Sequence, residues 1–402
     1  MSSEKSRVLG GLALGLTLAC LATAPAAAAP EPFRFGYLTD ASGPMQGTFK
    51  ATLDGFQLFV NQLNASGGVN GRPFQIEVRD IQSDTQRSVN AVQELAAANV
   101  LAILGLAVSN THAAVYASAE KLGVPVVAAY PANIPLALPP ATPNAFATGL
   151  IFSVTGEAAG KFAREIAPKG KTLVCLGFES PGSILACEAA TKSAEANGFT
   201  KVESIIVPLT QRDFRGVVDK VMAINPDVVT DCFGRGHVVS LLPALGAAGY
   251  DGVYLNMESG IGVDALRDAV RDAPDLKLYT YSRYIVDGQG PGPQAEALRA
   301  AAKSAGFKEL LTYHAAGWTL GLVVADAAAK CGEPCDRAAF TKALEQVSVD
   351  TGGLSGAPVK FSATDHYGSS AYRLYRFDHE KKSFSPVGAW LPATSAPAVA
   401  KK

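Results

Sequence analysis

The sequence predicts an α/β protein with two lobes, each built on a parallel β-sheet covered by helices. Short, continuously apolar runs alternate with longer amphipathic stretches, which is typical of parallel strands buried on both faces. This alternation runs from Phe33 to Ala129, is interrupted by a loop rich in Pro and Ala at 131–144, and then starts again. A chain of 402 residues has room for two domains of ordinary size.

The first half of the chain predicts one lobe. In its first expected helix, Leu53, Phe56, Val60 and Leu63 recur at spacings of three and four residues, so they share one helix face. The strands are expected at 33–39, 74–79, 100–106 and 124–129, and the helices at 50–64, 86–99 and 111–122.

The second half repeats the same order of elements. Strands are expected at 171–178, 202–207, 227–233 and 252–257, and helices at 156–167, 183–197, 214–224 and 237–248. A strand at 279–284 and a turn rich in Gly and Pro precede three further helical stretches, the last at 337–346. Two short strands, at 358–361 and 372–377, complete the prediction.

Composition excludes several classes of protein. Hydrophobic residues make up 48% and charged residues 18% of the chain, which supports a large core rather than disorder. The 35 Lys and Arg residues balance the 36 Asp and Glu residues, so no basic surface for a nucleic acid is expected. The only long apolar run lies at the N-terminus.

That N-terminal run has the pattern of a cleaved bacterial secretory signal. Lys5 and Arg7 precede an apolar stretch, and a tract of small residues ends at Ala29. We expect residues 1–28 to be a signal peptide and the protein to be periplasmic. The alternatives are a membrane anchor and a lipid on Cys20, although Thr17-Leu18-Ala19 does not follow the usual order of a lipidation motif.

Five cysteines follow the predicted signal. The segment Cys331-Gly-Glu-Pro-Cys335 predicts a disulfide that closes a short loop at a helix end in an oxidising compartment. Metal ligation and redox catalysis are the alternatives, but no second Cys or His pair has a zinc-like spacing. Cys175 and Cys232 lie in apolar, strand-like runs and are expected to be buried rather than reactive; Cys187 lies in a predicted helix.

Common enzyme motifs are not evident in the sequence. The sequence lacks the phosphate-binding loop, the H-E-x-x-H metal motif and the G-x-S-x-G nucleophile motif. Its nearest match to a dinucleotide motif, Gly260 to Ala265, follows the fourth strand of its lobe and not the first, so we interpret it as an ordinary turn. We therefore expect no catalytic residues, no cofactor and no metal.

One strand-to-helix junction is suited to ligand binding. Ser109, Asn110 and Thr111 follow the strand at 100–106 and precede a helix. They serve either as caps alone or as an anion site, because the first N–H groups of a helix are free to bind an anion.

Several segments of the chain form a pattern found in a known family. The most specific is Asn64-Ala65-Ser66-Gly67-Gly68-Val69-Asn70-Gly71-Arg72-Pro73. Supporting segments are Phe35 to Thr39, Ser42-Gly43-Pro44, Asp80 with Ser83-Asp84-Thr85, Ala247-Ala248-Gly249, Thr351-Gly352 and Asp365 to Gly368. They cover nearly the whole chain after the signal, in order, and together they resemble the Leu/Ile/Val-type periplasmic binding proteins of bacterial ABC importers.

The resemblance implies a type I periplasmic binding protein fold, with two Rossmann-like lobes, three crossovers and a cleft between the lobes. It places 30–148 plus 284–350 in the N-terminal lobe, 149–283 plus 351–392 in the C-terminal lobe, and 393–402 in a flexible tail. It also implies a monomeric receptor that closes on a small amino acid, carboxylate or amide and delivers it to an ABC permease. The alternatives are a ligand sensor for a signalling partner and an enzyme on the same scaffold.

The resemblance also assigns site residues. Ser109 matches the serine that holds the ligand carboxylate, Tyr130 the residue that offers backbone groups, and Glu258 the acid that pairs with the ligand ammonium. Phe233, at the end of a strand, and Asn110, beside Ser109, complete this candidate set.

Three departures from the family pattern argue against a standard branched-chain amino acid. Ala132 replaces a threonine, Pro181 and Gly234 replace aromatic walls, and the first-loop aromatic falls at Thr48 or Phe49. Arg235 and His237 are candidates for a different polar contact with the ligand. The alternative for Arg235 is that it is a solvated loop charge.

Overall fold

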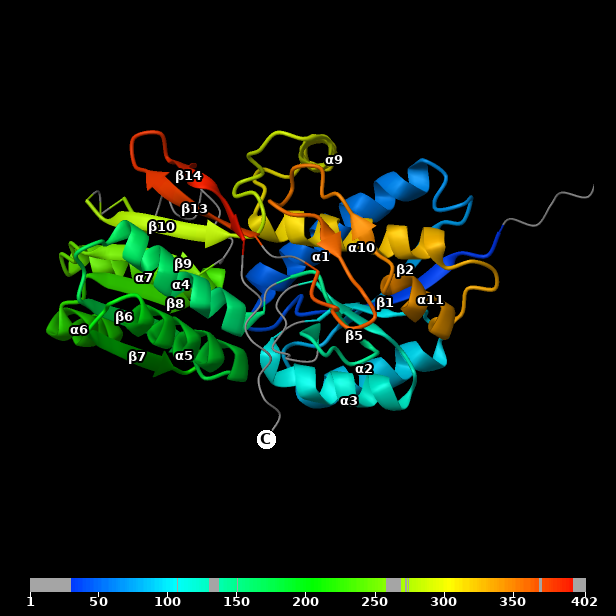
Figure 1. The fold of residues 1–402 in the computed structure, drawn as a ribbon, viewed down its shortest axis with the longest axis horizontal. Coiled ribbons are helices and arrows are strands. Elements are labelled where there is room, and N and C mark those ends of the chain that lie inside the picture. Colours follow the sequence, from blue (N-terminus) through cyan, green and yellow to red (C-terminus); the bar gives the residue numbers. More distant parts are fainter. Residues whose placement is uncertain are drawn as a thin grey trace, which may run out of the picture. The chain divides into compact units, whose positions relative to one another are not determined.

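The computed structural model describes residues 30–106, 108–129, 137–149, 151–257, 269–271, 273, 275–368 and 371–392 (Figure 1). The predicted signal peptide, the predicted tail, the Gly260–Ala265 turn, Tyr130, Ala132 and Glu258 lie outside these residues. From Pro32 onward the chain groups into one compact unit. No helix among the described residues has the length and apolar character needed to cross a membrane.

The first sheet has five parallel strands in the order β2-β1-β3-β4-β5. Its strands are β1 (Phe33–Thr39), β2 (Phe74–Asp80), β3 (Ile103–Gly105), β4 (Val126–Ala128) and β5 (Ala145–Ala147). The four predicted strands are confirmed. β5 was not predicted; it directly follows the loop rich in Pro and Ala at 131–144, which interrupts the alternating pattern.

Helices cover both faces of this sheet. They are α1 (Gln46–Ala65), α2 (Thr85–Ala97) and α3 (His112–Lys121), with a short 3₁₀ turn at Ser109–Thr111, and they are joined by α9 (Pro293–Ser304), α10 (Thr312–Lys330) and α11 (Arg337–Leu344). In Figure 1, α1 and α10 lie on one side of the sheet and α2 and α3 on the other. A Cβ on Gly317 would lie only 1.9 Å from the Thr52 carbonyl oxygen, so this glycine allows α10 to pack closely on α1.

The second sheet has seven strands in the order β14-β13-β10-β9-β8-β6-β7. The parallel strands are β6 (Thr172–Phe178), β7 (Lys201–Val207), β8 (Val228–Cys232), β9 (Val253–Met257) and β10 (Lys277–Ser282), and the antiparallel ones are β13 (Ala371–Asp378) and β14 (Ser383–Pro392). The edge strand β14, which contains Pro386 and Pro392, was not predicted. Prolines are tolerated there because β14 is an edge strand. A separate two-stranded ladder joins β11 (Ser348–Val349) to β12 (Val359–Lys360).

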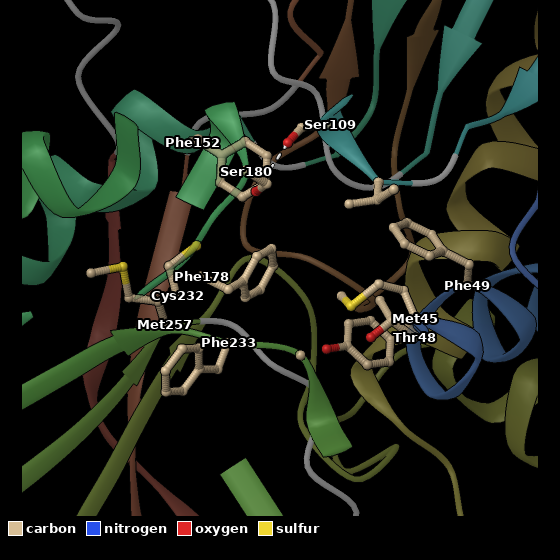
Figure 2. Close-up of a pocket in the computed structure, with 13 residues that line it drawn as sticks. Met45, Thr48, Phe49, Ser109, Phe152, Phe178, Ser180, Cys232, Phe233 and Met257 are labelled. Atoms are coloured by element: carbon tan, nitrogen blue, oxygen red, sulfur yellow. Dashed lines mark hydrogen bonds between the residues drawn. The ribbon is translucent and has the colours of Figure 1, made fainter. Parts of the chain in front are cut away.

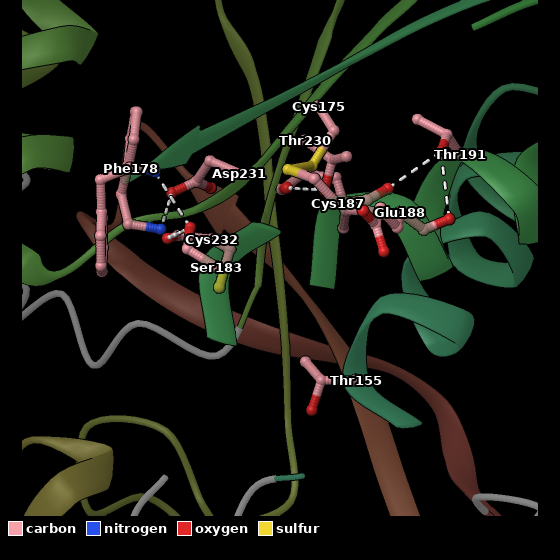
Figure 3. Close-up of a disulfide and its surroundings, with 12 residues drawn as sticks. Thr155, Cys175, Phe178, Ser183, Cys187, Glu188, Thr191, Thr230, Asp231 and Cys232 are labelled. Carbon is pink, nitrogen blue, oxygen red and sulfur yellow. Dashed lines mark hydrogen bonds between the residues drawn. A yellow bond between two sulfur atoms is a disulfide. The ribbon is translucent and has the colours of Figure 1, made fainter. Parts of the chain in front are cut away.

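The helices of the second sheet are α4 (Phe152–Ile166), α5 (Pro181–Ala196), α6 (Arg215–Ile224) and α7 (Arg235–Ala247). A disulfide joins Cys175 in β6 to Cys187 in α5, with a Cα–Cα distance of 5.5 Å (Figure 3). Cys175 is buried as expected, but it also forms a disulfide, which was not predicted. The sequence could not show this, because it does not reveal which helix residue lies over the strand.

The second disulfide joins Cys331 and Cys335 just after α10, with a Cα–Cα distance of 5.4 Å. These are the two cysteines for which the sequence predicts a bridge. Cys232 takes part in neither disulfide, and it is buried.

The chain passes three times between the part with the five-stranded sheet and the part with the seven-stranded sheet. The buried Arg283, on the second passage, donates hydrogen bonds to the carbonyl oxygens of Gly149 and, at 3.2 Å, Thr148 on the first. Tyr284 donates to the same Thr148 oxygen at 2.7 Å. The Arg283 guanidinium also lies 4.9 Å from the ring centre of Tyr367, on the third passage. The three passages are therefore fastened to one another.

Candidate functional site

An apolar pocket lies where the strand ends of the two sheets face each other (Figure 2). The space between its walls, open solvent included, is about 450 Å³, and the cavity volume itself is about 40 Å³. The five-stranded side contributes the start of α1 and the segment after β3, and the seven-stranded side contributes the ends of β6, β8 and β9. The lining residues are Met45, Thr48, Phe49, Val108, Ser109, Phe152, Phe178, Ser180, Cys232, Phe233, Gly234, Met257 and Tyr313.

The position of the pocket follows from the direction of the strands. In open parallel sheets, ligands bind beyond the carboxyl ends of the strands, where the loops leave a crevice. Phe178 and Met257 end β6 and β9, and Phe233 follows β8 directly. Two such edges therefore supply both walls of the site.

The wall on the seven-stranded side is a stack of rings. Phe178 and Phe233 lie almost parallel, at 9° with ring centres 6.3 Å apart. The His237 ring lies 5.5 Å from each of them. Burial lowers the pKa of His237, so its ring is neutral near neutral pH and adds no charge. Phe214 meets Phe233 edge-on at 5.6 Å.

Buried polar groups hold this wall from behind. Ser183, in α5, accepts a hydrogen bond from the Phe178 N–H at 3.0 Å and donates to the Cys232 carbonyl at 2.9 Å (Figure 3). Asp231 accepts hydrogen bonds from the Asn256 side chain at 2.9 Å and from the Phe233 N–H at 3.2 Å. Burial of Asp231 raises its pKa to about 7. The ring wall is therefore fixed at both of the strand ends that carry it.

The opposite wall belongs to the first turn of α1. Met45, Thr48 and Phe49 line the pocket there. The buried carboxylate of Asp40 accepts the Met45 N–H at 3.2 Å, and the Thr39 hydroxyl donates to the Phe49 carbonyl at 3.2 Å. The backbone of this turn is thereby tied to the end of β1.

Hydroxyl groups gather at one end of the pocket. Ser109 donates to the Ser180 hydroxyl at 3.3 Å and accepts the Gly182 N–H at 3.0 Å. Ser180 is the N-cap of α5 and accepts the Ser183 N–H at 3.3 Å. Ser109 follows β3, whereas Ser180 and Gly182 begin α5, so these bonds connect the two sides of the pocket.

Charged side chains do not line the part of the pocket that the structure describes. Its polar lining groups are the hydroxyls of Ser109, Ser180, Thr48 and Tyr313, and the remaining side chains are aromatic, aliphatic or sulfur-containing. Such a site binds an apolar body and orients one polar group.

The structure brings some of the predicted site residues together. Phe49, Ser109 and Phe233 line the pocket. Asn110 is exposed and donates to the Ser83 carbonyl at 3.1 Å, and Pro181 is an exposed residue at the start of α5. Neither lines the pocket, and Tyr130, Ala132 and Glu258 are not described.

Arg235 also lies outside the pocket lining. Its guanidinium pairs with Glu309 at 2.7 Å, and both side chains are about a quarter exposed. It is thus an ion-paired residue at the start of α7 rather than a charge facing only solvent.

Most of the lining was not predicted from the sequence. The candidate residues did not include Met45, Phe152, Phe178, Ser180 and Met257. A systematic reading of strand ends could have found Phe178, Ser180 and Met257, since they end or follow predicted strands. Nothing in the sequence pattern points to Phe152 or Met45, which come from helix starts.

Comparisons with known proteins agree with this geometry. Residues 32–383 match the family described as periplasmic binding protein. A fatty acid ABC transporter substrate-binding protein from Thermomonospora curvata has 21% identity and a TM-score of 0.77, with 90% of this chain and 93% of that chain covered. A solute-binding protein of an ABC transporter from R. palustris, in complex with benzoate, has 19% identity and a TM-score of 0.79, with 92% and 99% covered.

A branched-chain amino acid transporter substrate-binding protein from Streptococcus pneumoniae, in complex with isoleucine, has 18% identity and a TM-score of 0.71, with 90% and 99% covered. At these identities the similarity shows the fold. The predicted fold class, type I with two lobes and three crossovers, is confirmed.

Proposed function

The chain belongs to the periplasmic binding protein family, and we propose that it is a receptor that captures a small apolar carboxylic acid and presents it to an ABC importer. The observation that carries this proposal is the largely apolar lining of the pocket, with the hydrogen-bonded hydroxyls of Ser109 and Ser180 at one end. The protein binds its ligand without converting it, acts in the periplasm after removal of a signal peptide, and works as a monomer.

The hydroxyl end of the pocket is suited to a carboxylate. A carboxylate oxygen placed between the two lobes would accept hydrogen bonds from Ser109, Ser180 and the Gly182 N–H, in place of the bonds these groups make to one another. The α5 N-terminus adds a favourable dipole. Ser180 thereby supplies a hydroxyl that the Ala132 substitution removes from the family pattern.

The rest of the ligand is expected to be apolar. Phe49, Phe152, Phe178 and Phe233 surround the space beyond the hydroxyls. An ammonium group there would be buried without a counter-charge from the described lining, at a cost of several kcal/mol. One related protein belongs to a fatty acid ABC transporter and another is in complex with benzoate, and this range of acids supports the proposal.

Ligand binding is coupled to closure of the two lobes in this proposal. The bonds from Ser109 to Ser180 and Gly182 and the Arg235–Glu309 pair join elements of the two sides. A ligand that contacts both walls stabilises this arrangement over an open one, and the closed form is what the permease recognises.

A thermal-shift screen of the protein without its predicted signal tests the proposal. The probes are the sodium salts of benzoate, hexanoate and 4-methylpentanoate, with leucine and glucose for comparison. A ligand at a hundred times its Kd adds about 2.7 kcal/mol to the free energy of unfolding and raises the midpoint. Stabilisation by an acid supports the proposal, and stabilisation by glucose alone contradicts it.

A further inference from the structure

We infer that the Met45 side chain sets the size limit of the pocket and that Gly234 provides the space into which Met45 fits. This inference rests on the proposed function, because it concerns which apolar acids the pocket admits. It assigns a specificity-determining role to a contact between α1 and the segment that precedes α7.

The two residues touch across the pocket. A Cβ built on Gly234 would lie 2.7 Å from the Met45 Cε and 3.2 Å from its Sδ. Real Cβ atoms essentially never approach another heavy atom within 3.0 Å. The tip of the Met45 thioether therefore occupies the place that any larger residue at position 234 would need, and Figure 2 shows Met45 extending from α1 into the pocket.

The backbone at position 234 does not itself require glycine. Gly234 has φ −76° and ψ 162°, a region open to every residue. The other neighbour of the added Cβ, the His237 Nδ1, lies at 3.7 Å, an ordinary contact. Met45 is thus the one close obstacle to a side chain at position 234 among the described residues.

Met45 is suited to an adjustable wall. Its backbone N–H is held by Asp40 at 3.2 Å and its carbonyl accepts the Thr48 N–H at 3.0 Å, so its position is fixed up to the Cβ. Beyond the Cβ, the unbranched thioether rotates about several bonds and adapts to irregular space. Moving this tip changes the pocket without moving the ring wall.

A double-mutant cycle measured by calorimetry tests the inference, with straight-chain monocarboxylates of increasing length as probes. Met45→Ala should shift the preference to acids with a longer chain. Binding affinity should increase about fourfold for each additional buried methylene. Gly234→Ala should push the Met45 side chain into the pocket. The affinity for the longest acid that the wild type binds should then fall by about tenfold.

The cycle gives a discriminating result. Once Met45 is alanine, an alanine at position 234 has nothing to displace, so Gly234→Ala should then change affinity by less than about twofold. An equal effect of Gly234→Ala in both backgrounds would overturn the inference. Met222→Ala, in α6 and outside the pocket lining, is the matched control and should leave the length preference unchanged.

A second measurement keeps the test independent of the ligand class. The sequence has four methionines, so spectra of ¹³C-methyl-methionine protein contain few signals. Gly234→Ala should shift the Met45 methyl signal and leave that of Met222 in place, and an unmoved Met45 signal would contradict the inference. Failure of every acid to bind the wild type would instead count against the proposed function, while the Met45 shift would still support the contact.

Discussion

The two walls of the pocket are built in different ways. The wall on the seven-stranded side consists of stacked rings held by Ser183 and Asp231 and lies near the Cys175–Cys187 disulfide. The wall on α1 is fixed through its backbone, but its Met45 side chain is free to adapt beyond the Cβ. The difference indicates that the two walls have different roles. The rigid ring wall supports the body of the ligand, and the adaptable α1 wall limits its size.

The largest effect expected from breaking the rigid wall concerns Asp231 and pH. Its pKa is raised in the folded protein to about 7 by burial, whereas the unfolded chain ionises near pH 4. The unfolded state thus loses its proton first, and stability should fall as pH rises through this window, by up to about 1.4 kcal/mol per pH unit.

Urea unfolding at several pH values checks this. Asp231→Asn should lack the loss of stability between pH 5 and pH 7. Buried histidines whose pKa is lowered, such as His237 and His314, act in the opposite direction and are common to both proteins, so they cancel in the difference. Parallel pH profiles for wild type and variant would show that Asp231 is ionised throughout.

The buried disulfide should have the next largest effect. Removing the bridge with Cys175→Ala and Cys187→Ala should lower the free energy of unfolding by about 3 kcal/mol, because it frees a loop of the unfolded chain. Removing the Cys331–Cys335 bridge, which closes a shorter loop, should cost about 2 kcal/mol.

Denaturant titration measures both losses. Cys175 and Cys187 are almost fully buried, whereas Cys335 is partly exposed, so mild reductant should open the Cys331–Cys335 bridge first. Mass spectrometry after partial reduction and alkylation shows which of the two disulfides opens first. Earlier opening of the buried bridge would mean that the rigid wall is less protected than the structure indicates.

The hydroxyl end is tested by Ser109→Ala. Hydrogen bonds to a charged group contribute about 1.5–3 kcal/mol, so affinity for the bound acid should fall by about tenfold to a hundredfold. Ser66→Ala, on the exposed end of α1, is the matched control and should bind as the wild type does. If calorimetry shows no change for Ser109→Ala, the carboxylate lies elsewhere.

A smaller effect separates the two walls. Phe178→Leu removes a ring from the stack. The affinity for benzoate should fall by about tenfold and that for hexanoate by less than about threefold, because only a flat ligand gains from ring stacking. Phe49→Leu, on the α1 wall, should affect both acids alike. If the ratio of benzoate affinity to hexanoate affinity is the same in both variants, the two walls do not differ in the way proposed.

The sequence predicted much of the fold, because strands buried on both faces appear as continuous apolar runs. The run at 33–39 matches β1, and the runs at 171–178 and 202–207 match β6 and β7 to within a residue. β5 and β14 were not predicted, since β5 follows the loop that interrupts the pattern and β14 is an edge strand containing prolines.

The site was less accessible to sequence analysis. Ser109 and Phe49 were found by resemblance and Phe233 by its place at a strand end, and all three line the pocket. The Met45–Gly234 contact and the Cys175–Cys187 bridge each join segments whose approach depends on packing between elements, which no local pattern records.

The central claim is that the pocket takes an apolar acid without an ammonium group, and one matched pair of ligands tests it most directly. Leucine and 4-methylpentanoate share a carboxylate and a branched body, and only leucine carries the ammonium. Calorimetry of the wild type should show 4-methylpentanoate binding at least about tenfold tighter than leucine, because the ammonium would be buried unpaired. Tighter binding of leucine, with the preference abolished in Glu258→Gln, would contradict the account and assign to Glu258 the ammonium-pairing role that the family resemblance predicts.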